Sequence, residues 1–230
     1  RGILALGLAQ LTLAALLWAT LSLWRRERSQ PTDPAATGEP PVVFKPVARR
    51  ALWLAPLCFL FYVAAEMGTG LWAASILVND RGISLPQAGF WVSLYFGSIT
   101  AGRFGVGLVS ERLGNRRLVR LGVTLALAGA ALFALPGLPA LMSLAGLVLM
   151  GLGCAPVFPS LMHEAARRFP ADVARTVIGR QMMAAYAGGS VIPAGFGLLA
   201  TWVGLGAVMP VVMLLLIALL WATRALDRLT

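Results

Sequence analysis

Charged residues are scarce in this chain of 230 residues, where Asp, Glu, Lys and Arg make up 12% against roughly 25% in a soluble domain. Histidine and cysteine are rarer still, with one and two residues. That scarcity excludes the usual zinc sites, which need three or four such ligands. The chain also lacks a phosphate-binding loop and a nucleophile elbow. We therefore expect no metal, no cofactor and no enzyme activity.

Polar stretches are almost absent, and apolar residues make up 59% of the chain. Most apolar runs hold about 20 residues or more, enough to cross a hydrocarbon core of roughly 30 Å at about 1.5 Å per helical residue. The pattern predicts an all-α polytopic membrane helix bundle. Both cysteines, Cys58 and Cys154, fall inside runs and are expected to be small buried hydrophobes. The predicted spans are residues 2–24, 52–78, 86–109, 118–135, 139–162, 177–202 and 206–223.

Basic residues dominate the few charges, with 19 Lys and Arg against 9 acidic residues. They gather around alternate joints, after the first, third, fifth and seventh runs, and Arg81 alone lies in the other joints. This distribution does not fit a nucleic-acid partner, which needs one continuous basic face or arm. Because Lys and Arg resist translocation, the basic joints and the C-terminus are predicted to be cytoplasmic.

One polar segment interrupts the apolar pattern. Residues 29–46 are rich in proline and polar residues, and such a composition cannot bury a core. The expected organisation is a span at 1–24, a flexible cytoplasmic linker at 25–50 and a six-helix bundle at 51–230. Since the chain begins with Arg1 and runs at once into a span, we expect it to be a fragment.

Glu66 is the one ionisable residue near the middle of a predicted span. A carboxylate at that depth costs about 2.5–3.5 kcal/mol on insertion scales, so intramembrane acids are usually functional. Tyr62 and Thr69 share its helix face at i−4 and i+3. Because desolvation favours the neutral carboxyl, Glu66 is predicted to exchange protons, bind substrate or both. The alternative is a protonated Glu66 bonded to a neighbouring helix.

Further candidates for a solute site are Trp72, Tyr95, Gln181 and Tyr186. Aromatic rings stack on sugar faces and amides bond to hydroxyl groups, as a polar ligand requires. Trp and Tyr near span ends are also ordinary interfacial anchors, so this signal is weaker than that of Glu66.

A second candidate group surrounds the joint after the third run. There a glycine permits close helix approach, an acid follows, another glycine suits a tight turn, and arginines face the anionic inner leaflet. With Arg103 and Glu164, the acid and arginines are predicted to form an ion-pair cluster that breaks and re-forms as a cytoplasmic gate. The alternative is a basic loop that only sets topology. The motif residues are Gly107, Glu111, Arg112, Gly114, Arg116 and Arg117.

Residues 107–117, GLVSERLGNRR, resemble the short-loop signature of the major facilitator superfamily, G-x3-[D/E]-[R/K]-x-G-x-[R/K]-[R/K], with every defined position filled. Residues 151–160 and 188–197 look like the tenth and eleventh spans of that family. The resemblance implies span six, a linker and spans seven to twelve, with the N-terminal six-helix half missing. It also implies a gate in which the motif acid, Glu111, caps a helix of the opposite half.

Residues 61–72, FYVAAEMGTGLW, are similar to the seventh span of sugar-type members related to fucose:proton symporters, with Ala64 in place of the usual glycine. The resemblance implies proton-coupled transport of a small polar solute, such as a sugar, by alternating access in a bacterial inner membrane. The expected partners are the solute, protons, the lipid bilayer and the missing half. The alternatives are a non-transporting scaffold and proton-driven efflux of amphipathic compounds through an apolar cavity that includes Met67, Met182, Met183 and Phe196.

Overall fold

The computed structural model describes residues 10–20 and 48–230, apart from the side chains of Val109 and Glu111. It divides the chain into two units, Arg1–Val43 and Phe44–Thr230. The described part of the first unit is one short apolar helix, Gln10–Thr20. The rest of the predicted first span, and the linker up to residue 47, lie outside the described residues.

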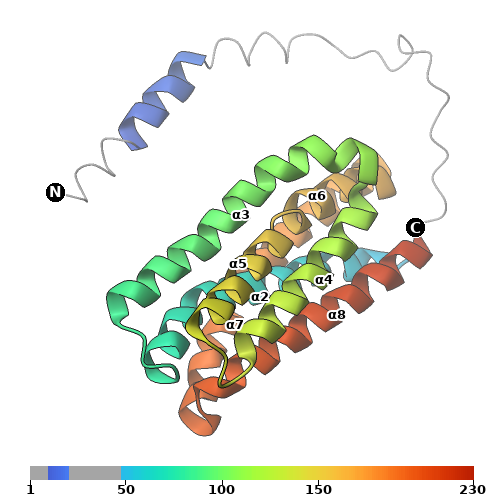
Figure 1. Cartoon of the computed structure of the whole chain (residues 1–230). Coiled ribbons are helices and arrows are strands. Elements are labelled where there is room, and N and C mark those ends of the chain that lie inside the picture. The colour runs from blue at the N-terminus through green and yellow to red at the C-terminus, as the bar shows by residue number, and fades with distance from the viewer. Residues whose placement is uncertain (1–9, 21–47) are drawn as a thin grey trace. The chain divides into compact units, whose positions relative to one another are not determined.

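The second unit is a bundle of α-helices, which run side by side along its length (Figure 1). Helices predominate because hydrocarbon offers no partner for backbone N–H and C=O groups, which must bond within the segment. The predicted all-α architecture is confirmed. Its elements are α2 (Ala51–Asn79), α3 (Leu85–Leu113), α4 (Asn115–Ala134), α5 (Ala140–Cys154), α6 (Val157–Arg168), α7 (Ala171–Val203), the short 3-10 helix η2 (Leu205–Ala207) and α8 (Val208–Leu229).

Five segments of the described residues are long and apolar enough to cross a membrane: Ala51–Asn79, Asn115–Ala134, Ala140–Arg168, Ala171–Val203 and Leu205–Leu229. Helix α3 has the same length as α2 but is not among them. Its sequence carries Arg103 well inside the helix, together with several glycines and hydroxyl residues. Of the six predicted spans that lie within the described residues 48–230, five therefore meet the criterion of length and apolar composition.

The run predicted as one span at 139–162 is two helices. Helix α5 ends at Cys154 and α6 begins at Val157, with a short turn between them. Pro156 and Pro159 explain the break, because proline has no N–H to donate and its ring clashes with the preceding turn. The two helices together still form one segment long and apolar enough to span a membrane, Ala140–Arg168, which extends beyond the predicted end at residue 162.

Gly114 separates α3 from α4 by a single residue, as the motif predicts. Its φ of 72° lies in the left-handed region, which glycine adopts without a Cβ clash. Its N–H donates to the carbonyl of Ser110 at 3.0 Å, and its carbonyl accepts from Leu118 at 3.1 Å. One glycine thus closes α3 and starts α4. This turn and the helix ends rich in arginine define what we call the arginine-rich end of the bundle.

Helices α4 and α5 approach each other through glycines. A Cβ atom built on Gly122 would lie 2.6 Å from the carbonyl oxygen of Gly153, and one on Gly146 would lie 2.7 Å from the backbone nitrogen of Phe133. Gly129 likewise faces the backbone of α5 at Gly146 and Met150. Small residues allow such close backbone contact between membrane helices. The α4–α5 pair is therefore packed backbone against backbone.

We expect Gly146→Ala to destabilise the bundle by about 1–3 kcal/mol, the usual cost of overpacking. The three atoms nearest to the added methyl group are all backbone atoms of α4, so no side chain can move aside. Gly195→Ala is the matched control, because nothing lies within 4 Å of a Cβ at that helical position. Thermal unfolding of the purified variants in detergent measures both. Equal midpoints for the two variants would contradict the prediction.

Candidate functional site

Glu66 lies buried in the middle of α2, with 6% of its surface exposed. Helix α2 packs against α7, α8 and α3. The Arg103 side chain of α3 reaches the carboxylate, with Nη2 at 3.9 Å from Oε1, and remains half exposed. The structure therefore places one cation beside the buried acid, within the same unit of the chain. Arg103 pairs with Glu66, whereas Glu164, the other described acid of the predicted gate, pairs with Arg116 and Arg168.

Hydroxyl groups lie around Glu66, and that of Tyr62 also hydrogen-bonds to its carboxyl. The Tyr62 hydroxyl donates to the carbonyl of Cys154 at 3.1 Å, and the Tyr95 hydroxyl donates to the backbone carbonyl of Glu66 at 3.1 Å. The Thr69 hydroxyl lies 3.6 Å from the Met150 sulfur. All three side chains are almost fully buried. The predicted face of α2 thus points into the bundle, where its hydroxyls position α2 against α3 and α5.

The break after α5 explains why Tyr62 finds a partner. Cys154 is the last residue of α5, and the last carbonyls of a helix have no partner within it. A buried carbonyl without a partner costs free energy, so the tyrosine hydroxyl satisfies it. Sequence periodicity placed Tyr62 on the face of Glu66 but gave no signal for this acceptor.

The remaining solute-site candidates lie apart from one another. Trp72 donates its indole N–H to the carbonyl of Pro193 at 2.9 Å, which ties α2 to α7. Gln181 is 2% exposed, and its Oε1 is one of two buried side-chain atoms without a partner among the described residues. Tyr186, also on α7, is 76% exposed. Tyr186 is the most exposed of this group, and Trp72 is partly buried.

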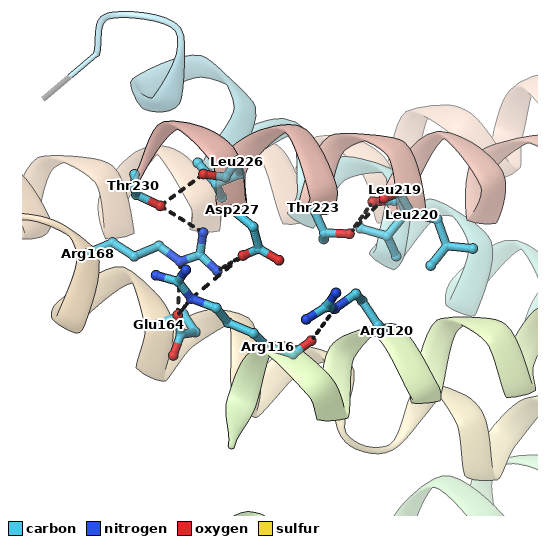
Figure 2. Close-up of polar contacts among 10 residues, drawn as sticks. All are labelled: Arg116, Arg120, Glu164, Arg168, Leu219, Leu220, Thr223, Leu226, Asp227 and Thr230. Atoms are coloured by element: carbon cyan, nitrogen blue, oxygen red, sulfur yellow. Dashed lines mark hydrogen bonds and ion pairs between the residues drawn. The ribbon is translucent and has the colours of Figure 1, made fainter. Parts of the chain in front are cut away.

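Four charged side chains meet at the arginine-rich end, drawn in Figure 2, and we call them the inner charge cluster: Arg116, Glu164, Arg168 and Asp227. Glu164 Oε2 lies 3.0 Å from Arg116 Nε and 3.1 Å from Arg168 Nε. Asp227 Oδ1 lies 2.5 Å from Arg168 Nη2 and 3.7 Å from Arg116 Nε. The cluster joins the start of α4 to α6 and to the end of α8.

Burial differs within the inner charge cluster. The side chains of Arg168 and Glu164 are 5% and 8% exposed, whereas that of Arg116 is 41% exposed. Arg168 also donates to the Thr230 hydroxyl at 3.0 Å. Two acids and two arginines balance each other, so each buried charge has an opposite partner, as buried charges require. Arg168 is the member whose loss leaves the most buried negative charge.

The motif residues take separate positions. Gly107 and Arg112 are exposed on α3, and Arg117 is exposed on α4. Gly114 forms the turn and Arg116 joins the inner charge cluster. The side chain of Glu111 lies outside the described residues.

A family model described as Major Facilitator Superfamily matches residues 3–193 and, in a second alignment, residues 57–228. The chain belongs to the major facilitator superfamily. It is therefore an integral membrane protein of a transporter family, and the expectation that it is not an enzyme is confirmed by this assignment.

Solved structures of two transporters share the fold. A mutant of the peptide transporter POT, crystallised with alafosfalin, superposes with a TM-score of 0.69 at 16% identity and covers 76% of this chain and 37% of that one. A D-xylose–proton symporter gives 0.58 at 16% identity, over 76% and 46%. Bypass of stop codon protein 6 of Saccharomyces cerevisiae is 25% identical over 179 residues, 74% of this chain and 36% of that protein. The chain thus spans less than half the length of each.

Two members of the inner charge cluster, Arg168 and Asp227, were not predicted from the sequence. Arg168 follows Glu164 by four residues, a spacing at which opposite charges meet on a helix. Asp227 lies near the C-terminal end of α8, where an acid opposes the helix dipole. Either feature could have served as a signal. The four-residue spacing pairs Arg168 with Glu164, and an acid in an unfavourable position, such as Asp227, usually has a cationic partner.

The opposite end of this superfamily fold holds a cavity of about 570 Å³. Arg81, the one basic residue of the three arginine-poor joints, lines it and donates to the carbonyl of Phe133. Its guanidinium also lies 4.9 Å from the centre of the Phe133 ring. Burial lowers the pKa of Arg81 from its usual value, and the neighbouring Asp80 opposes that shift. The contact fastens the joint after α2 to the end of α4, where a cation is favoured.

Proposed function

We propose that the chain is part of a proton-coupled secondary transporter that moves a small polar solute, such as a sugar, by alternating access. The observation that carries this proposal is the buried Glu66 carboxyl, 3.9 Å from the Arg103 guanidinium. A carboxyl inside a membrane bundle is costly and is retained mainly for binding or proton transfer. The neighbouring arginine stabilises the charged state, so both protonation states are accessible.

Under the proposal, part of the transport machinery lies outside this chain and part of it within. A preceding six-helix half supplies the other wall of the solute cavity, and residues 25–50 connect the two halves in the cytoplasm. The arginine-rich end lies on the cytoplasmic side of a bacterial inner membrane. The inner charge cluster, with Glu111, forms the gate at that end. Because the cluster links three helices by a few ion pairs, it suits a contact that breaks and re-forms between two states.

Efflux of amphipathic compounds is the second candidate, and a specific observation favours it. Met183 and Tyr186 are 68% and 76% exposed on α7, so this surface offers a thioether and an aromatic ring rather than hydroxyl groups. Polarizable methionine side chains adapt to varied apolar ligands. Phe196, in contrast, is buried against Gly68. The polar-solute proposal uses Tyr186 differently, as a ring that stacks on a sugar face.

Uptake by the complete protein in proteoliposomes tests the proposal. We expect accumulation of at least one member of a sugar panel that depends on an imposed proton gradient and disappears when the gradient is dissipated. Outward movement of lipophilic dyes, without sugar uptake, would favour efflux instead. A protein that moves neither class under either gradient direction would fit the scaffold alternative and contradict both transport proposals.

A further inference from the structure

A pocket of about 300 Å³ opens between α3, the start of α4 and α6, toward the arginine-rich end, and we call it the inner pocket. Its polar lining consists of Arg103, Ser110, Asn115, Ser160 and His163. A space of this size holds several water molecules, since each takes about 30 Å³ in the liquid. His163 is exposed, so the pocket reaches the surface. The pocket therefore provides a partly polar space, open to the surface, inside this half of the transporter.

Arg103 connects the inner pocket to the buried acid. Its guanidinium lines the pocket and lies 3.9 Å from the Glu66 carboxylate, while half of the side chain is exposed. The other titratable groups around Glu66 are Tyr62 of α2, Tyr95 of α3 and Cys154 of α5. Among these neighbours only arginine carries a positive charge, and it does so at every physiological pH. Among the described residues, the cation beside Glu66 thus lies on the side of the pocket.

We propose that protons pass between Glu66 and the cytoplasmic side through the inner pocket, and that Arg103 is the positioning residue for the deprotonated carboxylate. This inference rests on the proposed proton-coupled function. On release, the carboxyl O–H bond breaks, the proton passes to water in the pocket, and the electron pair stays on the carboxylate beside the guanidinium. His163 lines the same pocket.

Carbodiimide labelling tests the route without any solute. Inside-out vesicles holding the complete protein are treated with a water-soluble carbodiimide and glycine ethyl ester, and modification of Glu66 is measured by mass spectrometry. Ser110→Phe places a ring in the inner pocket and is expected to reduce modification severalfold. Ser93→Phe is the matched control, because Ser93 is exposed on the same helix and does not line the pocket. Equal modification in these two variants would overturn the route.

The Arg103→Gln variant provides a second test, in which modification of Glu66 is expected to rise rather than fall. Carbodiimides react with protonated carboxyls, and loss of the adjacent cation favours the protonated form, so modification at neutral pH is expected to increase. Arg112→Gln removes an exposed arginine from the same helix and is expected to leave modification unchanged. Unchanged labelling in Arg103→Gln would overturn its positioning role. Wild-type transport by Glu66→Gln would instead overturn the proposed function, so the two failures are distinguishable.

Discussion

The Glu66→Gln variant of the complete protein is expected to lose gradient-driven accumulation of its solute while still exchanging solute across the membrane. Glutamine keeps the size of the side chain but cannot take up or release a proton. For one proton moved with each solute, a gradient of one pH unit supports up to about tenfold accumulation, equal to about 1.4 kcal/mol. Without an exchangeable proton at Glu66, that ratio falls to one.

Exchange is expected to survive because it needs no net proton movement, and the neutral amide resembles the protonated carboxyl. Uptake and counterflow in proteoliposomes measure the two activities side by side. Asp172→Asn is the matched control, since it removes a carboxylate from an exposed position in the first turn of α7. Accumulation by Glu66→Gln at the wild-type level would make Glu66 a structural residue.

Of the single substitutions considered for this bundle, Arg168→Gln is expected to lower the free energy of unfolding the most. Its guanidinium is 5% exposed and contacts both Glu164 and Asp227, so its removal leaves two poorly compensated carboxylates. Breaking a buried ion pair from one side costs about 3–5 kcal/mol. For a unit of this size that corresponds to a fall of roughly 6–20 °C in the melting temperature, measured by thermal unfolding in detergent.

Two comparisons separate charge from packing at this position. Arg116→Gln is expected to cost only about 0–1 kcal/mol, because its side chain is 41% exposed and solvent screens the pair. Adding Glu164→Gln and Asp227→Asn to Arg168→Gln removes the uncompensated charges and is expected to restore most of the lost stability. A melting temperature of Arg168→Gln equal to that of the wild type would show that the inner charge cluster is not stabilising.

The lengths of the apolar runs, with arginines between them, were enough to predict the helices. The glycine of the motif was enough to predict the turn at Gly114. Both signals are local, because bilayer thickness sets the run length and glycine alone suits a φ of 72°. The run at 139–162 was predicted as one span, and its division into α5 and α6 falls at Pro156 and Pro159. Proline within an apolar run can bend a membrane helix without ending it, so the residues alone did not show that two helices form.

Which residues of different helices contact each other could not be predicted from the sequence. Helical spacing correctly grouped Tyr62 with Glu66, but it could not show that the Tyr62 hydroxyl bonds to Cys154, which is 92 residues away. It also could not show that Arg103 reaches Glu66 whereas Arg116 reaches Glu164. Which of several arginines meets which acid depends on helix rotation and packing angle, and a single sequence does not encode either in a local pattern.

The close contact of α4 with α5 limits which amino-acid substitutions this sequence can accept. Gly122 and Gly129 on one helix, and Gly146 and Gly153 on the other, are spaced by seven residues, which is about two helical turns. Every missense change of a glycine codon adds at least a methyl group, and at these sites that group meets the backbone of the partner helix. The four codons can therefore change silently but have no conservative amino-acid replacement, whereas the codon of Gly195 does.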